Sequence, residues 1–348
     1  MIDLNDISAI NNLDPKKVYE STGMLSLQIR QVVDEYFEED LLPEDYSKVQ
    51  NIVICGMGGS AYGGHIANSL FQDSRLLPIE VNSTYTLPGY VNENTLVLLA
   101  SYSGSTEEVL KCLDVAKGKN AKIAGFSSGG ELGDKIKEAG YPGFTFNPQH
   151  NPSGQPRLGT GYVVFSTLYF LSKIGAITLT KDEVLAALNE FDGNSNKIRM
   201  EAQKIAKELI DRIPVIFASE HLNGNAHIMR NQFNETSKSF SAFSDIPELN
   251  HHLMEGFKNP KDKALSVLIL DSDLYSPVIS KRIGLTKNVV EKNEIQALAF
   301  NALGSTKLSQ VISTLSFGGY LTVYLGLLYG LDPSLIPWVD YFKEELKK

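Results

Sequence analysis

Short apolar runs alternate with helical segments along this chain, and that alternation constrains its fold more than any other feature. The first half is predicted to contain strands at Asn51–Cys55, Ile79–Asn82, Thr95–Ala100, Ala121–Phe126 and Gly143–Phe146, with helices near 61–71, 106–117 and 131–139. The second half is predicted to contain strands at Pro214–Ala218, Leu265–Leu270 and Ala297–Phe300, with helices at 221–239, 275–285 and Thr306–Tyr329. Such alternation predicts α/β architecture, with parallel sheets covered by helices on both faces.

The chain length favours two domains, because 348 residues exceed one ordinary core. We place the division within a charged helical stretch at 181–211, giving domains 1–190 and 191–348. A faint repeat at an offset of 162 residues supports two similar domains. It pairs Val53-Ile54 with Val215-Ile216, and His65-Ile66 with His227-Ile228. Few positions match, so chance similarity remains an alternative.

Composition and charge narrow the classes of partner. The formal net charge of -9 argues against nucleic acid or an anionic membrane as the main partner. The two cysteines, Cys55 and Cys112, form no disulfide framework, and the acidic N-terminus does not resemble a signal peptide, so we expect a cytoplasmic protein. Ser and Thr interrupt the most apolar segments, 161–177 and 311–331, which therefore read as buried helices.

Two polar turns in the first half are candidate anion sites. Gly56-Met57-Gly58-Gly59-Ser60 and Ser101-Tyr102-Ser103-Gly104-Ser105-Thr106 each follow an apolar strand and open a helix. Glycine lets backbone approach a ligand, and N–H groups with hydroxyls suit phosphate oxygens. A tight turn without a ligand is the simpler reading of the first motif. A dinucleotide site, with Gly56-x-Gly58-x-x-Ala61 and Glu80, ranks lower because it needs no second hydroxyl-rich turn.

The second half carries a Glu and a His sixteen positions apart. Glu235 lies in Asn234-Glu235-Thr236-Ser237-Lys238, and His251 lies in Pro247-Glu248-Leu249-Asn250-His251-His252. These residue types can divide proton abstraction and proton donation near neutral pH. The simpler readings are a surface pair of Glu235 with Lys238 and a capping or buried His251. Lys307, at an expected helix start, is unfavourable with the helix dipole, which mildly favours a functional role.

Together these segments resemble the phosphoglucose/phosphomannose isomerase family, which is built from two sugar-isomerase (SIS) domains. Arg157 in Gln155-Pro156-Arg157 and Lys307 in Ser305-Thr306-Lys307 complete the matching pieces, whose order covers nearly the whole chain. The resemblance implies two SIS-type αβα sandwich domains. It implies that the sugar phosphate is held by Gly59, Ser60, Ser101, Ser103 and Thr106. Family members commonly carry Asn where this chain has Ser105 and His252, which leaves sugar preference in doubt.

The resemblance also implies catalytic roles for four residues. Glu235 would be the base that moves a proton between the first and second carbons. His251 and Lys307 would assist ring opening, and Arg157 would steady the enediolate. In this family the His often reaches the site from a neighbouring subunit, so a homodimer is expected.

The predicted activity is interconversion of glucose 6-phosphate, and of mannose 6-phosphate as a further substrate, with fructose 6-phosphate. This chemistry requires no redox cofactor and no metal. A zinc site is disfavoured because the intervals His251-His252 and His221 to His227 do not match metal-ligand spacings. A non-catalytic sugar-phosphate binder is the main alternative, and it would need none of Glu235, His251 and Lys307. An amidotransferase is disfavoured because no Cys lies near the start of the chain.

Overall fold

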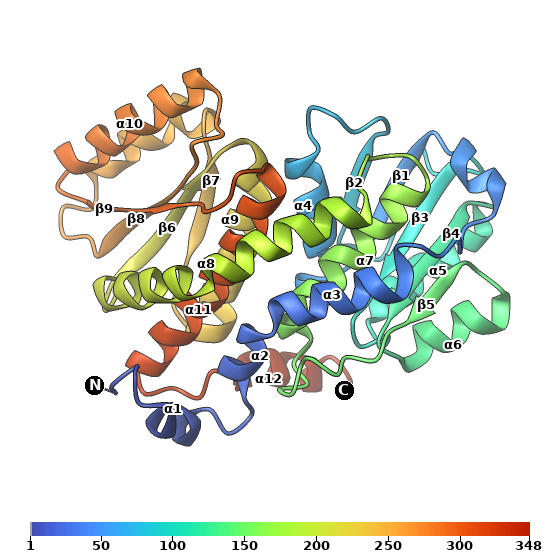
Figure 1. Cartoon of the computed structure of the whole chain (residues 1–348), viewed down its shortest axis with the longest axis horizontal. Coiled ribbons are helices and arrows are strands. Elements are labelled where there is room, and N and C mark those ends of the chain that lie inside the picture. The colour runs from blue at the N-terminus through green and yellow to red at the C-terminus, as the bar shows by residue number, and fades with distance from the viewer. Residues whose placement is uncertain (1) are drawn as a thin grey trace.

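The computed structural model describes residues 2–348 and contains two parallel sheets, one in each half of the chain (Figure 1). The first sheet has the strand order β2-β1-β3-β4-β5, and the second has the order β7-β6-β8-β9. The strands of the first sheet are β1 Asn51–Cys55, β2 Ile79–Asn82, β3 Thr95–Ala100, β4 Lys122–Ser127 and β5 Gly143–Thr145. Those of the second are β6 Ile213–Ala218, β7 Ala242–Asp245, β8 Leu265–Asp271 and β9 Gln296–Asn301. Parallel αβα architecture is therefore confirmed in both halves.

Helices cover the two faces of each sheet. They are α1 Ile7–Leu13, α2 Val18–Gly23, α3 Leu25–Tyr36, α4 Tyr62–Leu70, α5 Glu107–Gly118, α6 Gly130–Ala139, α7 Thr160–Lys173, α8 Lys181–Glu208, α9 Asn223–Gln232, α10 Pro277–Lys292, α11 Lys307–Leu328 and α12 Pro337–Glu345. The side chains of successive β1 residues point to opposite faces of the sheet and pack into different hydrophobic clusters. Ile52 and Ile54 pack toward α4 and α7, whereas Val53 and Cys55 pack toward α5 and α6.

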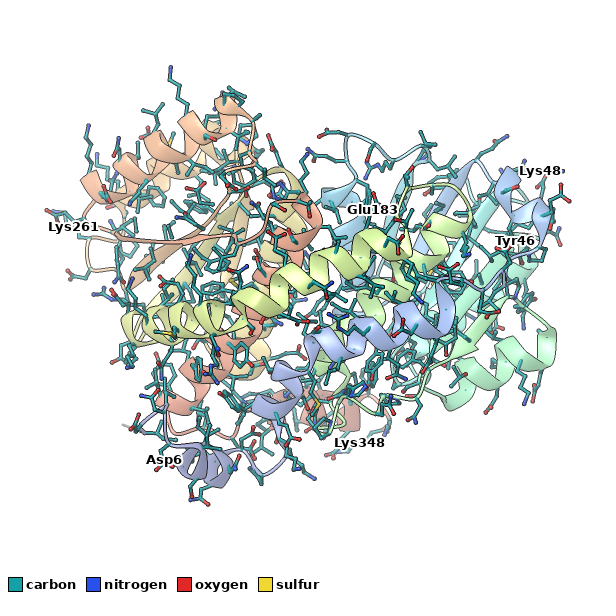
Figure 2. The ribbon with its side chains drawn as sticks, in the orientation of Figure 1. Asp6, Tyr46, Lys48, Glu183, Lys261 and Lys348 are labelled. Atoms are coloured by element: carbon teal, nitrogen blue, oxygen red, sulfur yellow. The ribbon has the colours of Figure 1, made fainter. Side chains whose placement is uncertain are left out.

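Two long helices cross the middle of the molecule between the sheets. α8 and α11 pack closely against each other (Figure 1). The predicted boundary at 190/191 falls inside α8, which runs unbroken from Lys181 to Glu208, so a division at that point stays a prediction. α11 is long and apolar enough to cross a membrane, but 89% of its most apolar 18-residue stretch is buried inside the protein. Charged side chains such as Lys48, Lys261 and Lys348 project at the periphery (Figure 2).

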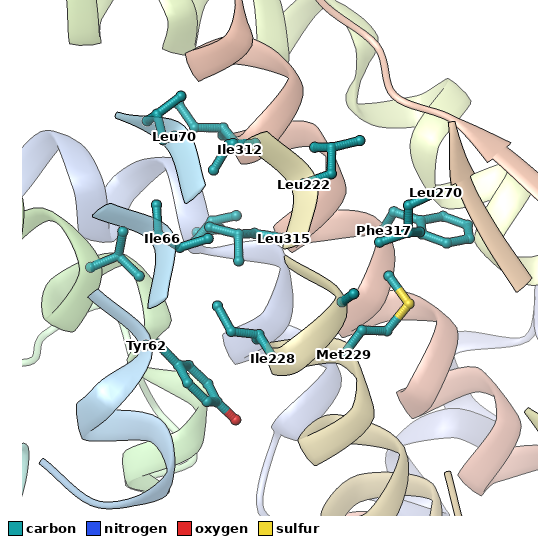
Figure 3. Close-up of a cluster of buried hydrophobic side chains, with 14 of the residues drawn as sticks. Tyr62, Ile66, Leu70, Leu222, Ile228, Met229, Leu270, Ile312, Leu315 and Phe317 are labelled. Carbon is teal, nitrogen blue, oxygen red and sulfur yellow. The ribbon is translucent and has the colours of Figure 1, made fainter. Parts of the chain in front are cut away.

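The two halves meet mainly through α4 and α9, the helices that the sequence repeat relates. Each is the first helix after the first strand of its half, as the repeat predicted. Their buried side chains interleave (Figure 3). The rings of His65 and His227 stack with centroids 3.8 Å apart. A Cβ on Gly224 would lie 2.6 Å from the His65 carbonyl oxygen, so glycine is what allows the helices this close.

The structure differs from the sequence-based expectations at three places. The predicted helix at 221–239 ends as α9 at Gln232 and continues as one π-helical turn, Phe233–Ser237. β7 was not predicted, because its sequence Ala-Phe-Ser-Asp lacks an apolar run. α1 was not predicted either. Asp14-Pro15 has the residue types of a helix start, with a capping carboxylate and a proline, but α2 begins only at Val18. The Asp14 carboxylate accepts hydrogen bonds from the Val18 and Tyr19 amides at the start of that helix.

Candidate active site

The two predicted phosphate-binding turns lie side by side at the carboxyl ends of β1 and β3. These strands are neighbours, and the connections after them lead to opposite sides of the sheet. A crevice at such a reversal is where open α/β sheets bind ligands. The Ser60 hydroxyl accepts a 3.0 Å hydrogen bond from the Tyr102 amide and so ties one turn to the other. The first turn folds as a short 3-10 helix, Gly58–Ala61.

Hydroxyl groups cluster within the second turn. The oxygens of Ser101 and Thr106 are 2.9 Å apart, and the Gly104 amide donates to Ser101 at 3.1 Å. Ser103 is exposed and lies 3.1 Å, oxygen to oxygen, from Ser105. Ser105 was not a predicted ligand, although its place in the motif was a usable signal. The turn therefore presents several hydroxyls at one place, beside the free N-terminal amides of α5.

Arg157 reaches the same region from the loop before α7. Its backbone packs against the first turn, where a Cβ on Gly59 would lie 3.3 Å from the Arg157 Cα. The side chain is only 6% exposed. Nη1 donates to Gln155 at 3.0 Å, and Nη2 donates to the carbonyls of Pro333 and Ser334 at 2.9 Å. The buried Nε has no hydrogen-bond partner among residues 2–348, and burial lowers the pKa of the guanidinium.

Glu235 comes from the other half of the chain and lies in the π-helical turn after α9. Such turns inside or after α-helices are frequent at functional sites. Burial raises the pKa of the Glu235 carboxyl above its ordinary value. The charges of Arg157, Lys343 and Lys238 oppose that rise without cancelling it. Glu235 is therefore a desolvated carboxylate among three cations, the environment expected of a general base.

A segment near the C-terminus, residues 332–334, braces two of these cations, and we call it the C-terminal strap. Its Pro333 and Ser334 carbonyls hold Arg157, and its Asp332 carbonyl accepts from the Lys238 Nζ at 2.8 Å. Lys238 has a left-handed backbone, with φ 54°, and burial lowers the pKa of its amine to about 8. Beyond the strap, α12 carries the third cation, Lys343. The sequence carried no signal that joined this segment to Glu235.

The structure does not bring His251 and Lys307 to Glu235. His251 is exposed at the end of a short helix, Glu248–His251. Lys307 begins α11, and its Nζ lies 3.6 Å from the Asp73 carboxylate. It borders a separate cavity of about 370 Å³, whose other lining residues include Phe71, Leu179, Glu183 and Glu190. Neither is among the charged groups that act on the pKa of Glu235.

Within residues 2–348, no three His, Cys, Asp or Glu side chains are grouped so as to hold a metal ion. The ring nitrogen of His252 is instead 2.8 Å from Glu248. Glu80, the ribose-binding acid of the dinucleotide alternative, accepts a 2.7 Å hydrogen bond from the Tyr90 hydroxyl. His65 and His227, which the sequence offered only as repeat markers, stack on each other instead.

Fold and site together define a protein with two SIS domains. The C-terminal domain of glucosamine-fructose-6-phosphate aminotransferase from Francisella tularensis superposes with a TM-score of 0.68 at 16% identity, covering 91% of this chain and 96% of that one. Residues 198–346 match the family described as the bacterial phospho-glucose isomerase C-terminal SIS domain.

Relatives that match this chain over most of its length identify the family within the SIS-domain proteins. A bifunctional phosphoglucose/phosphomannose isomerase from Aquifex aeolicus is 30% identical, covering 90% of this chain and 95% of the relative. A protein of the same name from Caldicellulosiruptor bescii is 29% identical, covering 94% and 98%. The chain belongs to the bifunctional phosphoglucose/phosphomannose isomerase family.

Proposed function

We propose that the protein is an aldose–ketose isomerase that interconverts glucose 6-phosphate, and also mannose 6-phosphate, with fructose 6-phosphate. The observation that carries the proposal is Glu235, a partly buried carboxylate whose pKa is raised by burial and lowered in part by the charge of Arg157. Arg157 itself packs on the glycine of a predicted phosphate-binding turn. The family membership of the chain supports the same substrates.

In the proposed mechanism, Gly59, Ser60, Ser101, Ser103 and Thr106 bind the phosphate. Glu235 removes the proton on the second carbon of the open-chain aldose, and the electron pair moves onto the carbonyl oxygen to form an enediolate. The hydroxyl proton of the second carbon then passes to the oxygen of the first carbon, the electron pair left on the second oxygen forms the ketone carbonyl, and the carbon–carbon double bond takes the proton back from Glu235 at the first carbon. Arg157 stabilises the negative oxygen, because a buried cation aimed at developing charge needs no reorganisation. The reverse sequence converts ketose into aldose.

Ring opening requires a proton donor and a proton acceptor besides Glu235. The resemblance implies Lys307 and His251 for this step. We favour Lys343 as the lysine that assists ring opening, because its charge acts on the Glu235 carboxyl. Lys238, with its pKa lowered to about 8, is suited to hydrogen-bond a substrate oxygen.

We further propose a homodimer in which His251 of one protomer serves the Glu235 site of the other. Support comes from the exposure of His251 and from an apolar stripe on α12. The stripe contains Trp338, Tyr341 and Phe342, and Leu346 directly after the helix continues it; they are 81%, 57%, 61% and 65% exposed. Mixing two inactive variants, Glu235→Gln and His251→Ala, and allowing subunit exchange should restore part of the activity. Continued inactivity of the mixture would count against the shared site.

The isomerase itself is tested by coupled assays on both aldose phosphates. The wild-type protein should turn them over, whereas Glu235→Gln should lose at least about 10³-fold in kcat and retain sugar-phosphate affinity. Glu138→Gln, an exposed substitution on α6, is the matched control. Solvent tritium should enter the product, because the transferred proton passes through a carboxylate. Binding without turnover by the wild type would favour the non-catalytic alternative.

The proposed setting is the cytoplasm, where this reaction would serve glycolysis and gluconeogenesis. The two cysteines are unpaired and buried, which suits a reducing compartment. Fractionation of cells, with the isomerase activity followed in each fraction, tests this assignment. Recovery of the activity outside the cytoplasmic fraction would contradict it.

A further inference from the structure

Tyr62 is a buried polar residue near the site, and it takes no part in the proposed mechanism. It is the first residue of α4 and follows the phosphate-binding Ser60 by two positions. Its side chain is completely buried. Its hydroxyl makes no hydrogen bond of regular geometry among the described residues, although the Asn231 side chain lies near enough to donate to its oxygen. The hydroxyl proton therefore has no acceptor, which costs free energy in a buried position and calls for an explanation.

The packing of α4 against α9 brings Tyr62 toward Glu235. The start of α9 lies against the middle of α4, since a Cβ on Gly224 would lie 2.6 Å from the His65 carbonyl. The same Cβ would lie 2.7 Å from the Ser69 hydroxyl, further along α4, whereas His227, one turn further along α9, stacks on His65. The helices therefore run in opposite directions, and Tyr62 at the start of α4 faces the end of α9, where the Asn231 side chain acts on it. Figure 3 shows Tyr62 extending from α4 beside Ile228 of α9.

The charged groups around Tyr62 agree with this register. Burial is the main cause that raises the pKa of its phenol, and the Glu235 carboxylate raises it further. Arg157, Arg230 and the Asn231 amide act in the opposite direction. Among residues 2–348, Glu235 is thus the anion that acts on Tyr62, and it belongs to the opposite half of the chain. The cations that act on Glu235 are Arg157 from the loop before α7, Lys343 from α12 and Lys238 from its own turn.

We propose that Tyr62 is a positioning residue for Glu235, whose carboxylate accepts a hydrogen bond from the Tyr62 hydroxyl in the working enzyme. The inference rests on the isomerase function proposed above. Such a bond would fix one carboxylate oxygen and leave the other to face the substrate carbons. It would also favour the ionised carboxylate and so counteract the effect of burial on a base that must be deprotonated to act. Because Tyr62 follows the phosphate-binding turn, the bond would link substrate anchoring in one half to the base in the other.

The contrasting interpretation is that Tyr62 only fills the core between α4 and α9. Phenylalanine would then replace it without kinetic consequence, because the ring makes the packing contacts. Tyr62→Phe therefore separates the two interpretations. Removing a buried hydroxyl whose proton has no acceptor should change stability little, so a loss of activity would not reflect a weakened fold.

The experiment compares Tyr62→Phe with the wild-type protein in kcat and KM between pH 5 and pH 9. We expect kcat to fall about 10-fold with KM nearly unchanged, and the acid limb to move to higher pH by about one unit. Tyr90→Phe is the matched control, since Tyr90 donates to Glu80 near the sheet edge. Its kinetics should match the wild type. Kinetics of Tyr62→Phe equal to the wild type at every pH would overturn the inference.

Two further measurements keep the test decisive. Site-specific 3-fluorotyrosine at position 62 keeps the shape but is a stronger donor, so it should move the acid limb to lower pH. It also covers the case in which Tyr62→Phe fails to fold. If the wild type shows no isomerase activity, the proposed function fails, yet carbon NMR titration of Glu235 still tests Tyr62. The titration midpoint should rise in Tyr62→Phe, and an unchanged midpoint would refute the hydrogen bond.

Discussion

The close approach of α4 and α9 can be tested with one glycine. In Gly224→Ala the new Cβ would lie 2.6 Å from the His65 carbonyl oxygen and 2.8 Å from its carbonyl carbon. Backbone atoms cannot rotate away, so the helices must separate, at an overpacking cost of about 1–3 kcal/mol. Alanine also gains about 1 kcal/mol in helix propensity. We expect Gly224→Ala to lower the free energy of unfolding by up to about 2 kcal/mol, and to lower kcat because α9 leads directly into the turn of Glu235.

Gly193→Ala is the matched control for this substitution. Gly193 lies inside α8, is exposed, and has no atom within 4 Å of the position its Cβ would take. The same chemical change should therefore raise the free energy of unfolding by about 1 kcal/mol and leave kcat alone. Denaturant unfolding at pH 7 measures both variants, with an expected difference of roughly 1–3 kcal/mol between them. Equal stabilities would refute the argument that the two helices are in contact at this point.

Three other predictions concern the interface and the site. Burial lowers the pKa of His65 to about 4 and of His227 to about 3, so the unfolded chain takes up protons first as pH falls below about 6.5. Acidification from pH 6.5 to pH 4 should remove about 3 kcal/mol of stability through His65 alone, and His65→Phe should flatten that loss while His252→Gln should not. Deleting residues 332–348 removes the carbonyl groups that accept hydrogen bonds from Arg157 and Lys238. The kcat of the shortened chain should fall at least about 100-fold, while its circular dichroism spectrum stays nearly unchanged. Full activity of the shortened chain would contradict the role of the strap. Lys343→Ala should reduce kcat more than Lys307→Ala, and the reverse order would return ring opening to Lys307.

Much of the fold could be predicted because its signals are local. Apolar runs bounded by turn residues identified β1, β3 and β8, and helical patterns identified α5 and α8. β7 could not be predicted because apolar and polar side chains do not alternate along its four residues. Only its pairing with β6 makes it a strand. The π-helical turn at Glu235 is likewise set by tertiary packing, since the residues there continue a helical pattern.

The candidate site also has parts that the sequence predicts and parts that only the fold reveals. The hydroxyl-rich turn is contiguous in sequence, so its residues could be recognised together. Arg157 and Glu235 were inferred separately, and only the fold relates them. The contribution of the strap could not be inferred, because backbone carbonyls hold Arg157 and every residue type supplies those. The roles predicted for His251 and Lys307 stay predictions.

The strap also sets an order of events during protein synthesis. The ribosome makes Arg157 and Lys238 long before it makes Pro333 and Ser334, yet the guanidinium depends on those late carbonyls. A nascent chain can therefore complete both sheets while this guanidinium still lacks two of its acceptors. Catalytic competence would therefore emerge only after residues 332–334 have left the ribosome, well after Arg157 and Lys238 have been made.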